Sequence, residues 1–238
     1  MRRLNIAFGL QRAIRALVIW RAVLTLLLLL WWDGQSWTYR GGATRERRAE
    51  RQQQRAQWLT RQLLQLGSAF IKLGQLLSSR PDILPAGWVS ELASLQDSVP
   101  AFSFDRVQTV LEEELGQRCA EVIDLDPQPL GAASLAQVHR ASLRSGRQVV
   151  LKVQRQGLDR RFRLDLDVMQ QVAAVLQRHP TWGRGRDWPA MARECRRVLL
   201  RELDFRVEAQ YAARFRQQFL DDEQIRIPGV IWELSTRR

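Results

Sequence analysis

The sequence is poor in the residues that build metal centres and disulfide frameworks. It has only two cysteines, Cys119 and Cys195, and two histidines, His139 and His179, in 238 residues. The cysteines are too few and too far apart for a disulfide framework or a zinc site, and they fit a reducing compartment. The sequence therefore predicts no metal site.

Lysine is nearly absent, although the chain is strongly basic. Its formal net charge is +12, and of its 37 basic residues all but Lys72 and Lys152 are arginine. Lysine carries a compact point charge and arginine a planar fork, so the two do not replace each other at a tight site. The two lysines are therefore the first candidates for functional residues.

The basic charge is concentrated near the N-terminus. Residues 1–61 hold most of the excess of arginine over acidic residues, and the rest of the chain is close to neutral. A nucleic-acid-binding protein would carry a recognisable motif beside its basic surface, and this sequence has none. We therefore expect no nucleic-acid partner.

The basic segment includes an apolar run, residues 22–32 (AVLTLLLLLWW). A helix of that length spans about 16 Å, whereas the hydrocarbon core of a bilayer is ~30 Å thick. Arginines flank the run on both sides, which argues against a simple crossing. Residues 1–42 are therefore predicted to be membrane-associated on the cytoplasmic side, with residues 1–40 contacting lipid as an interfacial or re-entrant helix. A helix that docks on the protein itself, or on a partner, is the alternative.

The hydrophobic pattern predicts an α+β protein that changes character near Gly116. Residues 43–118 form a helical extension, and residues 119–238 a second domain of strands and helices. A loop is expected at 33–43. The predicted helices are 44–66, 86–96, 103–116 (with Ser103 as N-cap), 158–178 and 187–219, the last in two pieces. The predicted strands are 119–125, 135–143, 147–154 and 224–233, with a hairpin turn at Ser145-Gly146.

One candidate phosphate-binding loop runs from Gly131 to Val138. It matches the kinase pattern G-x-G-x-x-G-x-V at its first glycine and its valine, and the other two glycine positions are Ala133 and Ala136. Small residues allow the backbone to approach phosphate, although a methyl group restricts that approach. An ordinary tight hairpin is an equally good interpretation of the loop alone.

Lys152 ends the sequence Val149-Val-Leu-Lys152, soon after the candidate loop. This matches the V-A-I-K strand of protein kinases, whose lysine contacts phosphates and a helix glutamate. A surface lysine on an edge strand is the alternative, and the order of the two motifs favours the functional interpretation.

Three acidic residues, Glu202, Asp204 and Glu208, could each pair with a lysine. Asp204 and Glu208 are four apart and share a helix face. On the residues alone, a solvated face that balances Arg201 and Arg206 is the preferred interpretation.

Lys72 lies in an apolar stretch, within Lys72-Leu-Gly-Gln75. An unpaired lysine is expensive to bury, so its ammonium either reaches water or meets an acidic residue. Periodicity does not distinguish these alternatives.

Taken in order, these segments resemble the UbiB/AarF family of atypical protein-kinase-like proteins, which is associated with ubiquinone and related prenylquinones. The resemblance covers about residues 55–238. It rests on five segments: KLGQ at 72–75, PLGAASLAQVH at 129–139, VVLKVQRQG at 149–157, RELDFRVEAQ at 201–210 and IPGVIWELST at 227–236.

The resemblance implies a protein-kinase-like small lobe of antiparallel sheet and helices behind a helical extension. It implies that ATP is the cofactor and that Glu208, or else Glu202, pairs with Lys152. It also implies that Lys72 and Gln75 lie over the active site, restrict access of protein substrates and engage Glu202 and Asp204. The implied nucleotide-binding residues are Gly131, Ala132, Ala133, Ser134, Ala136, Val138 and Lys152.

The motifs of a kinase large lobe are missing. Asn5 is the only asparagine, His139 is followed by Arg140-Ala141, and Asp204-Phe205 is followed by arginine, so neither H-x-D-x-x-x-x-N nor D-F-G occurs. We therefore expect the chain to be the truncated, nucleotide-binding half of an atypical kinase or ATPase, and to be inactive alone. Whether the chain counts as an enzyme is left open by the sequence. It would need a C-lobe polypeptide to bind Mg²⁺ as well. A non-catalytic, membrane-associated regulatory or scaffold module is the alternative.

Overall fold

The computed structural model describes residues 2–39, 42, 44–82, 84–96 and 100–238, with side chains from residue 9 onward. The chain divides into two compact units. Unit 1 comprises Met1–Ser98 with Arg160–Arg196, and unit 2 comprises Val99–Asp159 with Arg197–Arg238. Each is described by itself.

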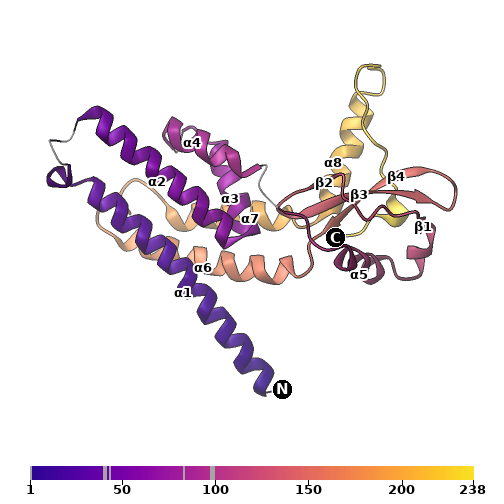
Figure 1. Ribbon diagram of the computed structural model, residues 1–238, viewed down its shortest axis with the longest axis horizontal. Coiled ribbons are helices and arrows are strands. Elements are labelled where there is room, and N and C mark those ends of the chain that lie inside the picture. Colours follow the sequence, from indigo (N-terminus) through magenta and orange to yellow (C-terminus); the bar gives the residue numbers. More distant parts are fainter. Residues whose placement is uncertain (1, 40–41, 43, 83, 97–99) are drawn as a thin grey trace. The chain divides into compact units, whose positions relative to one another are not determined.

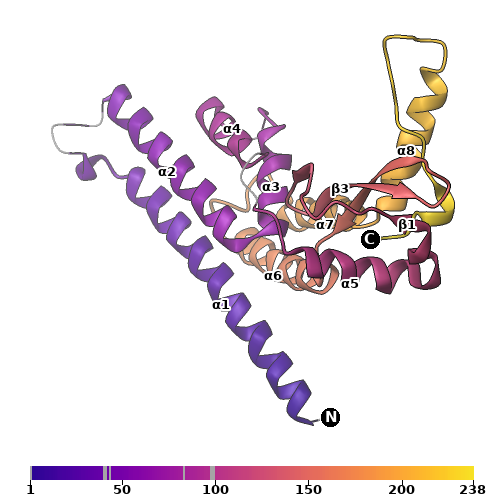
Figure 2. The ribbon, with the colours of Figure 1, turned by 45° about the vertical axis from the view of Figure 1, so that its right-hand side comes forward.

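Unit 1 is helical. Helices α1 and α2 run side by side in opposite directions, as Figures 1 and 2 both show. The other helices of the unit are α3, α4, most of α6 and the first part of α7. Their bounds are α1 Arg2–Asp33, α2 Arg45–Leu66, α3 Ser68–Ser78, α4 Ala86–Ala93, α6 Leu158–Arg178 and α7 Trp188–Arg201, with 3-10 turns at Ser36–Thr38 and Ser94–Gln96.

Local sequence explains how α2 and α3 begin and end. The Thr44 hydroxyl accepts a hydrogen bond from the Arg47 amide and caps α2. Gly67 ends α2 and starts α3 with φ of +92°, a conformation that side chains with a Cβ rarely adopt. The turn between the two helices therefore depends on glycine.

Helix α1 is fixed to its own unit near its middle and at its C-terminal end. Arg15 bonds both carboxylate oxygens of Asp165 on α6, at 2.6 and 2.8 Å, and Asp165 is only 1% exposed. Asp33, at the C-terminal end of α1, accepts hydrogen bonds from Arg51 and Arg55 of α2. Within unit 1, α1 therefore docks on the protein itself.

The N-terminal helix extends well beyond the apolar run of residues 22–32. Helix α1 has 32 residues, because it continues toward the N-terminus well beyond the 11-residue apolar run. Its segment Gly9–Asp33, with mean hydropathy of 2.2, is long and apolar enough to cross a membrane. The expected loop at 33–43 is shortened, because α1 includes Asp33 and a 3-10 turn follows; residues 40, 41 and 43 lie outside the described residues.

Unit 2 has an antiparallel sheet with helices (Figure 1). Strands β1 and β2 pair with successive parts of β3, and β4 pairs with β3 along its length. Buried Val107, Val110, Leu111 and Leu115 of α5 form a core with Val153 of β4. The bounds are α5 Phe104–Leu115, β1 Val122–Ile123, β2 Gly131–Ala132, β3 Ala136–Leu143, β4 Gln148–Gln154 and α8 Phe205–Gln218, with 3-10 turns at Gly116–Glu121 and Trp232–Leu234.

The expected α+β class is confirmed, as are the long helix at 158–178, the two-piece helix at 187–219 and the strands at β3 and β4. The turn at Ser145-Gly146 joins those two strands, with φ of +81° at Gly146. Two strand predictions are wrong. Residues 119–125 give only the two-residue β1, because a 3-10 turn extends to Glu121. Residues 224–233 form no strand, and Pro228 there lacks the amide that a ladder needs.

Candidate functional site

Lys152 on β4 and Glu208 on α8 form a close ion pair. The Lys152 ammonium lies 2.6 Å from Oε1 and 2.5 Å from Oε2 of Glu208, and 4.8 Å from the centre of the Phe205 ring. The two side chains are 40% and 59% exposed. Ion pairs this exposed contribute little stability, but they leave both charged groups within reach of a ligand.

The candidate loop forms a tight hairpin between β2 and β3. The Ala133 amide donates to the Ala136 carbonyl at 2.8 Å and closes the turn, so the small residues are divided between two strands and a short tip. Ala132 and Gln137 are paired across the hairpin, and Ser134 at the tip is buried. Both interpretations of this segment are therefore compatible with the structure, since a phosphate loop is itself a hairpin.

Three strands bring Gly131, Val138 and Lys152 into one row. Gly131 is paired with Val138, and Val138 with Lys152. Residues directly opposite one another in a sheet project to the same face. A Cβ added at Gly131 would meet nothing within 4 Å, so the face beside the ammonium is open at that point. Residues of the two kinase-like motifs thus meet on one face.

The three acidic residues have different surroundings. Asp204 caps α8 by accepting from the Arg206 amide, and its carboxylate also pairs with the Arg206 side chain at 2.8 Å. That side-chain hydrogen bond lowers the pKa of Asp204. Glu202 lies in the connection between α7 and α8. The interpretation that the acidic residues balance nearby arginines therefore applies to Asp204. Glu208 instead pairs with Lys152.

Arg155 holds the hairpin tip in place, a role that the sequence did not reveal. Its amide donates to the Leu135 carbonyl, and its guanidinium donates to the carbonyls of Ala133 and Pro100. Burial lowers the pKa of Arg155. An arginine directly after a buried strand end could have been singled out, but the 34 other arginines of the chain hide that signal.

A buried polar network on β3 was also missed. Gln137 accepts from the Phe102 amide and donates to His139 Nε2, whose ring donates from Nδ1 to the Asp126 carbonyl at 2.8 Å. Gln137 and His139 are almost fully buried. Polar residues at inward strand positions were the available signal, and the network ties two neighbouring loops to the sheet beside the hairpin.

Lys72 and Gln75 lie on α3 in unit 1. The Gln75 amide donates to the Leu95 carbonyl at 3.1 Å, within the same unit, and Lys72 is partly exposed. A Cβ at Gly74 would lie 2.3 Å from Leu95 Cδ1, so glycine permits close packing here. The expected engagement of Glu202 and Asp204 by this segment depends on how the two units are arranged, and it stays a prediction.

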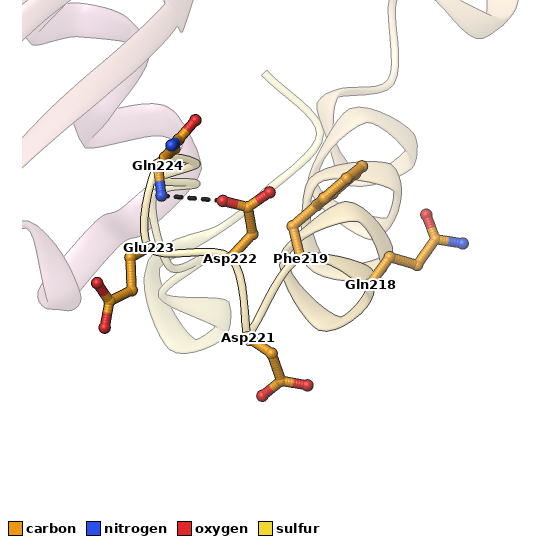
Figure 3. A pocket seen from close by; sticks show the side chains of 6 residues that line it. All are labelled: Gln218, Phe219, Asp221, Asp222, Glu223 and Gln224. Atoms are coloured by element: carbon orange, nitrogen blue, oxygen red, sulfur yellow. Dashed lines mark hydrogen bonds between the residues drawn. The ribbon is translucent and has the colours of Figure 1, made fainter.

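A surface hollow of ≈ 640 Å³ lies at the end of α8 (Figure 3). Residues of 218–224 line it, and Asp222 accepts from the Gln224 amide. None of the candidate nucleotide-binding residues belongs to it. Among the residues that the structure describes, no group of three or more His, Cys, Asp or Glu side chains could hold a metal ion.

Residues 94–238 match the sequence model of the ABC1 atypical kinase-like domain. The chain belongs to this family. The matched region includes all of unit 2 and both kinase-like motifs of the sheet. The resemblance to UbiB-type proteins is thereby confirmed, and the antiparallel sheet with its helices is a kinase-like fold.

Three curated relatives of this ABC1-family chain are longer than the chain itself. An uncharacterised protein of Synechocystis is 45% identical over 93% of this chain and 38% of its own length. Protein ACTIVITY OF BC1 COMPLEX KINASE 7, chloroplastic, of Arabidopsis thaliana is 40% identical over 94% and 32%. A probable protein kinase UbiB of Cellvibrio japonicus is 38% identical over 76% and 33%. The chain spans about a third of the length of these relatives.

A solved structure agrees with the family assignment. The Rv3197–erythromycin complex of Mycobacterium tuberculosis is similar with a TM-score of 0.53 and 29% identity, over 81% of this chain and 49% of that chain.

Proposed function

We propose that unit 2 binds the phosphates of ATP or ADP through the Lys152 ammonium, over the face formed by β2, β3 and β4. The observation that carries this proposal is the row Gly131, Val138, Lys152, with Glu208 against the lysine. In protein kinases a strand lysine contacts the nucleotide phosphates, and a helix glutamate pairs with that lysine. The side chains present fit such a ligand, because the ammonium is exposed and the face beside Gly131 is open.

These 238 residues hold nucleotide without transferring phosphate. Phosphoryl transfer needs a base or water-positioning group and side chains that bind Mg²⁺, and neither kinase motif for them occurs in this sequence. A C-lobe polypeptide would supply them, together with the metal. A role in prenylquinone metabolism rests on the relationship to UbiB proteins alone.

Nucleotide affinity tests this function. The Kd of the whole chain for ATP and ADP would be measured by calorimetry, alongside Lys152→Met and the control Arg106→Met, which removes an exposed cation from α5, the helix that packs on the other face of the sheet. We expect Lys152→Met to weaken binding about tenfold or more, or ~1.4 kcal/mol, and Arg106→Met to bind normally. Binding that survives Lys152→Met would contradict the proposal.

We also propose that α1 binds a membrane surface without crossing it. One side of α1 exposes Leu17, Leu24, Leu28 and Trp31, which are spaced at helical periodicity. The opposite side carries Arg15, whose pairing with buried Asp165 would be lost if α1 crossed a bilayer. Exposed Arg21 favours anionic lipid, because it can extend its charge to the headgroups.

Liposome flotation tests this second proposal. The chain should float with vesicles that contain phosphatidylglycerol, and alkaline carbonate should release it. The triple variant Leu17→Gln, Leu24→Gln, Leu28→Gln should not float. The control Tyr211→Gln, Phe215→Gln, Phe219→Gln, which removes exposed apolar surface from α8 and its C-cap, should float normally. Resistance to carbonate would show a spanning helix, and flotation of the α1 variant would exclude this surface.

A further inference from the structure

Gln154, the last residue of β4, is 2% exposed. A buried amide costs free energy unless its polar atoms are hydrogen-bonded. Its Nε2 donates to the Leu203 carbonyl at 2.9 Å, across 49 residues of sequence. A glutamine at this position therefore joins the nucleotide-facing strand to a distant segment of unit 2.

The acceptor residue, Leu203, directly precedes the start of α8. Leu203 is buried, and the next residue in the sequence, Asp204, is the N-cap of α8. The Phe205 amide, the next along, donates to the Arg237 carbonyl. The start of α8 is thus held by Gln154 from the sheet and by Arg237 from the C-terminal segment.

Gln154 and Lys152 are two residues apart on β4 and project to the same face. Glu208 lies about one helical turn beyond the N-cap of α8, so rotation or displacement of that helix start moves its carboxylate relative to the ammonium. Strand β4 thus carries both Lys152 and Gln154, the side chain bonded to the start of α8, and α8 carries Glu208, the partner of Lys152.

We propose that Gln154 is a positioning residue that fixes α8 so that Glu208 stays paired with Lys152. Gln154 does not itself contact the nucleotide. The inference that nucleotide affinity depends on it rests on the proposed function, whereas its effect on α8 does not.

The test compares two glutamines of the same strand. Gln154→Leu removes the bond to Leu203, whereas Gln148→Leu, the control, removes an exposed bond to Ser142. Hydrogen exchange of residues 203–212 would be followed by mass spectrometry without nucleotide. We expect exchange in Gln154→Leu to be about tenfold faster than in the wild type, and unchanged in Gln148→Leu. Unchanged exchange in Gln154→Leu would overturn the proposal whether or not the chain binds ATP.

Affinity for ATP then separates positioning from general destabilisation. Residues that act through one another have non-additive effects. Gln154→Leu should weaken ATP binding about tenfold in the wild-type background. It should have little further effect when Glu208→Gln is already present. Additive losses, or no loss at all in the single variant, would overturn the positioning role, whereas absence of ATP binding by the wild type would overturn the proposed function.

A near-isosteric variant guards against misfolding. Gln154→Glu keeps the shape, and its carboxyl can donate to Leu203 only when protonated. Relative to the wild type at each pH, exchange of α8 should be fast at pH 8 and approach wild-type protection as the pH falls to about 5, since burial favours the protonated carboxyl. Equal protection at both pH values would contradict the role of the hydrogen bond.

Discussion

Among single residues, Asp204 both caps a helix and forms an ion pair. Its carboxylate caps α8 through the Arg206 amide and pairs with the Arg206 guanidinium. The side-chain hydrogen bond from Arg206 lowers the pKa of Asp204 in the folded protein. The ionised carboxylate of Asp204 therefore stabilises the folded state relative to the unfolded chain. This stabilisation is fully present above the unfolded pKa of about 3.9 and is lost as the pH falls through the lower folded pKa.

Two variants of Asp204 separate the cap from the charge. Asp204→Ala should lower the free energy of unfolding by about 1 kcal/mol at pH 7, measured by urea unfolding, because α8 loses its cap. Asp204→Asn keeps a capping oxygen, so it should cost less at pH 7. Below about pH 4 the wild type should lose the stability that the ionised Asp204 contributes, whereas the stability of Asp204→Asn should not change for this reason. Equal costs for Ala and Asn at pH 7 would show that the cap is not the source.

Single residues also show what sequence can predict. Lys152 was identifiable because the chain has only two lysines and because it follows a hairpin with a kinase-like pattern. Its partner was not identifiable from the residues alone, since Glu208 is 56 residues away, and it was the family resemblance that named Glu208, or else Glu202. The bonds from Gln154 to Leu203 and from Gln75 to Leu95 span 49 and 20 residues, and side-chain bonds of that kind leave no periodic signal.

Close packing controls stability at the scale of elements, most clearly at α3. Alanine favours helix over glycine by up to ~1 kcal/mol, so a helical glycine needs a reason. At Gly74 the reason is buried Leu95 and Leu63, whose methyl groups lie within 2.9 Å of an added Cβ. Gly9 on α1 has nothing within 4 Å.

The two glycines should therefore respond oppositely to alanine. Gly74→Ala should destabilise unit 1 by about 1–3 kcal/mol through overpacking. Gly9→Ala should be neutral or stabilising, as helix propensity alone dictates. Thermal unfolding followed by circular dichroism measures both, and a stabilising Gly74→Ala would refute the close packing of α3.

The ion pair that joins α1 to α6 gives a prediction for the stability of α1 docking. Asp165 is buried and bonds Arg15 of α1, whereas Asp167 on the same helix is partly exposed and pairs with Arg196 at 2.6 Å and with Arg12 of α1 at 3.6 Å. Asp165→Asn should cost about 3 kcal/mol and expose α1 to trypsin, because a partly buried guanidinium loses its counter-charge. The matched Asp167→Asn should cost under about 1 kcal/mol. Trypsin cleavage in α1 that is equal in both variants would contradict the anchoring role of Asp165.

The two units differ, at the scale of the whole molecule, in how far the sequence predicted them. The order of five short motifs was enough to place the chain in the ABC1 family and to predict a helical region followed by a kinase-like sheet. The predicted strand at 224–233 failed because an apolar segment forms a strand only where a neighbouring strand can pair with it. The anchoring of α1 at Asp165 and Asp33 was missed because its partners lie on other helices.

The proposed contact between Lys152 and the nucleotide phosphates can be measured directly, because the chain has only two lysines. An acyl-phosphate derivative of ATP transfers its acyl group to a lysine amine beside the phosphates and releases ATP. Peptide mapping of the labelled chain can report only Lys72, Lys152 and the N-terminal amine. We expect Lys152 to be acylated, and we expect excess ATP to suppress this labelling. Absence of label on Lys152, or labelling that excess ATP does not reduce, would contradict it.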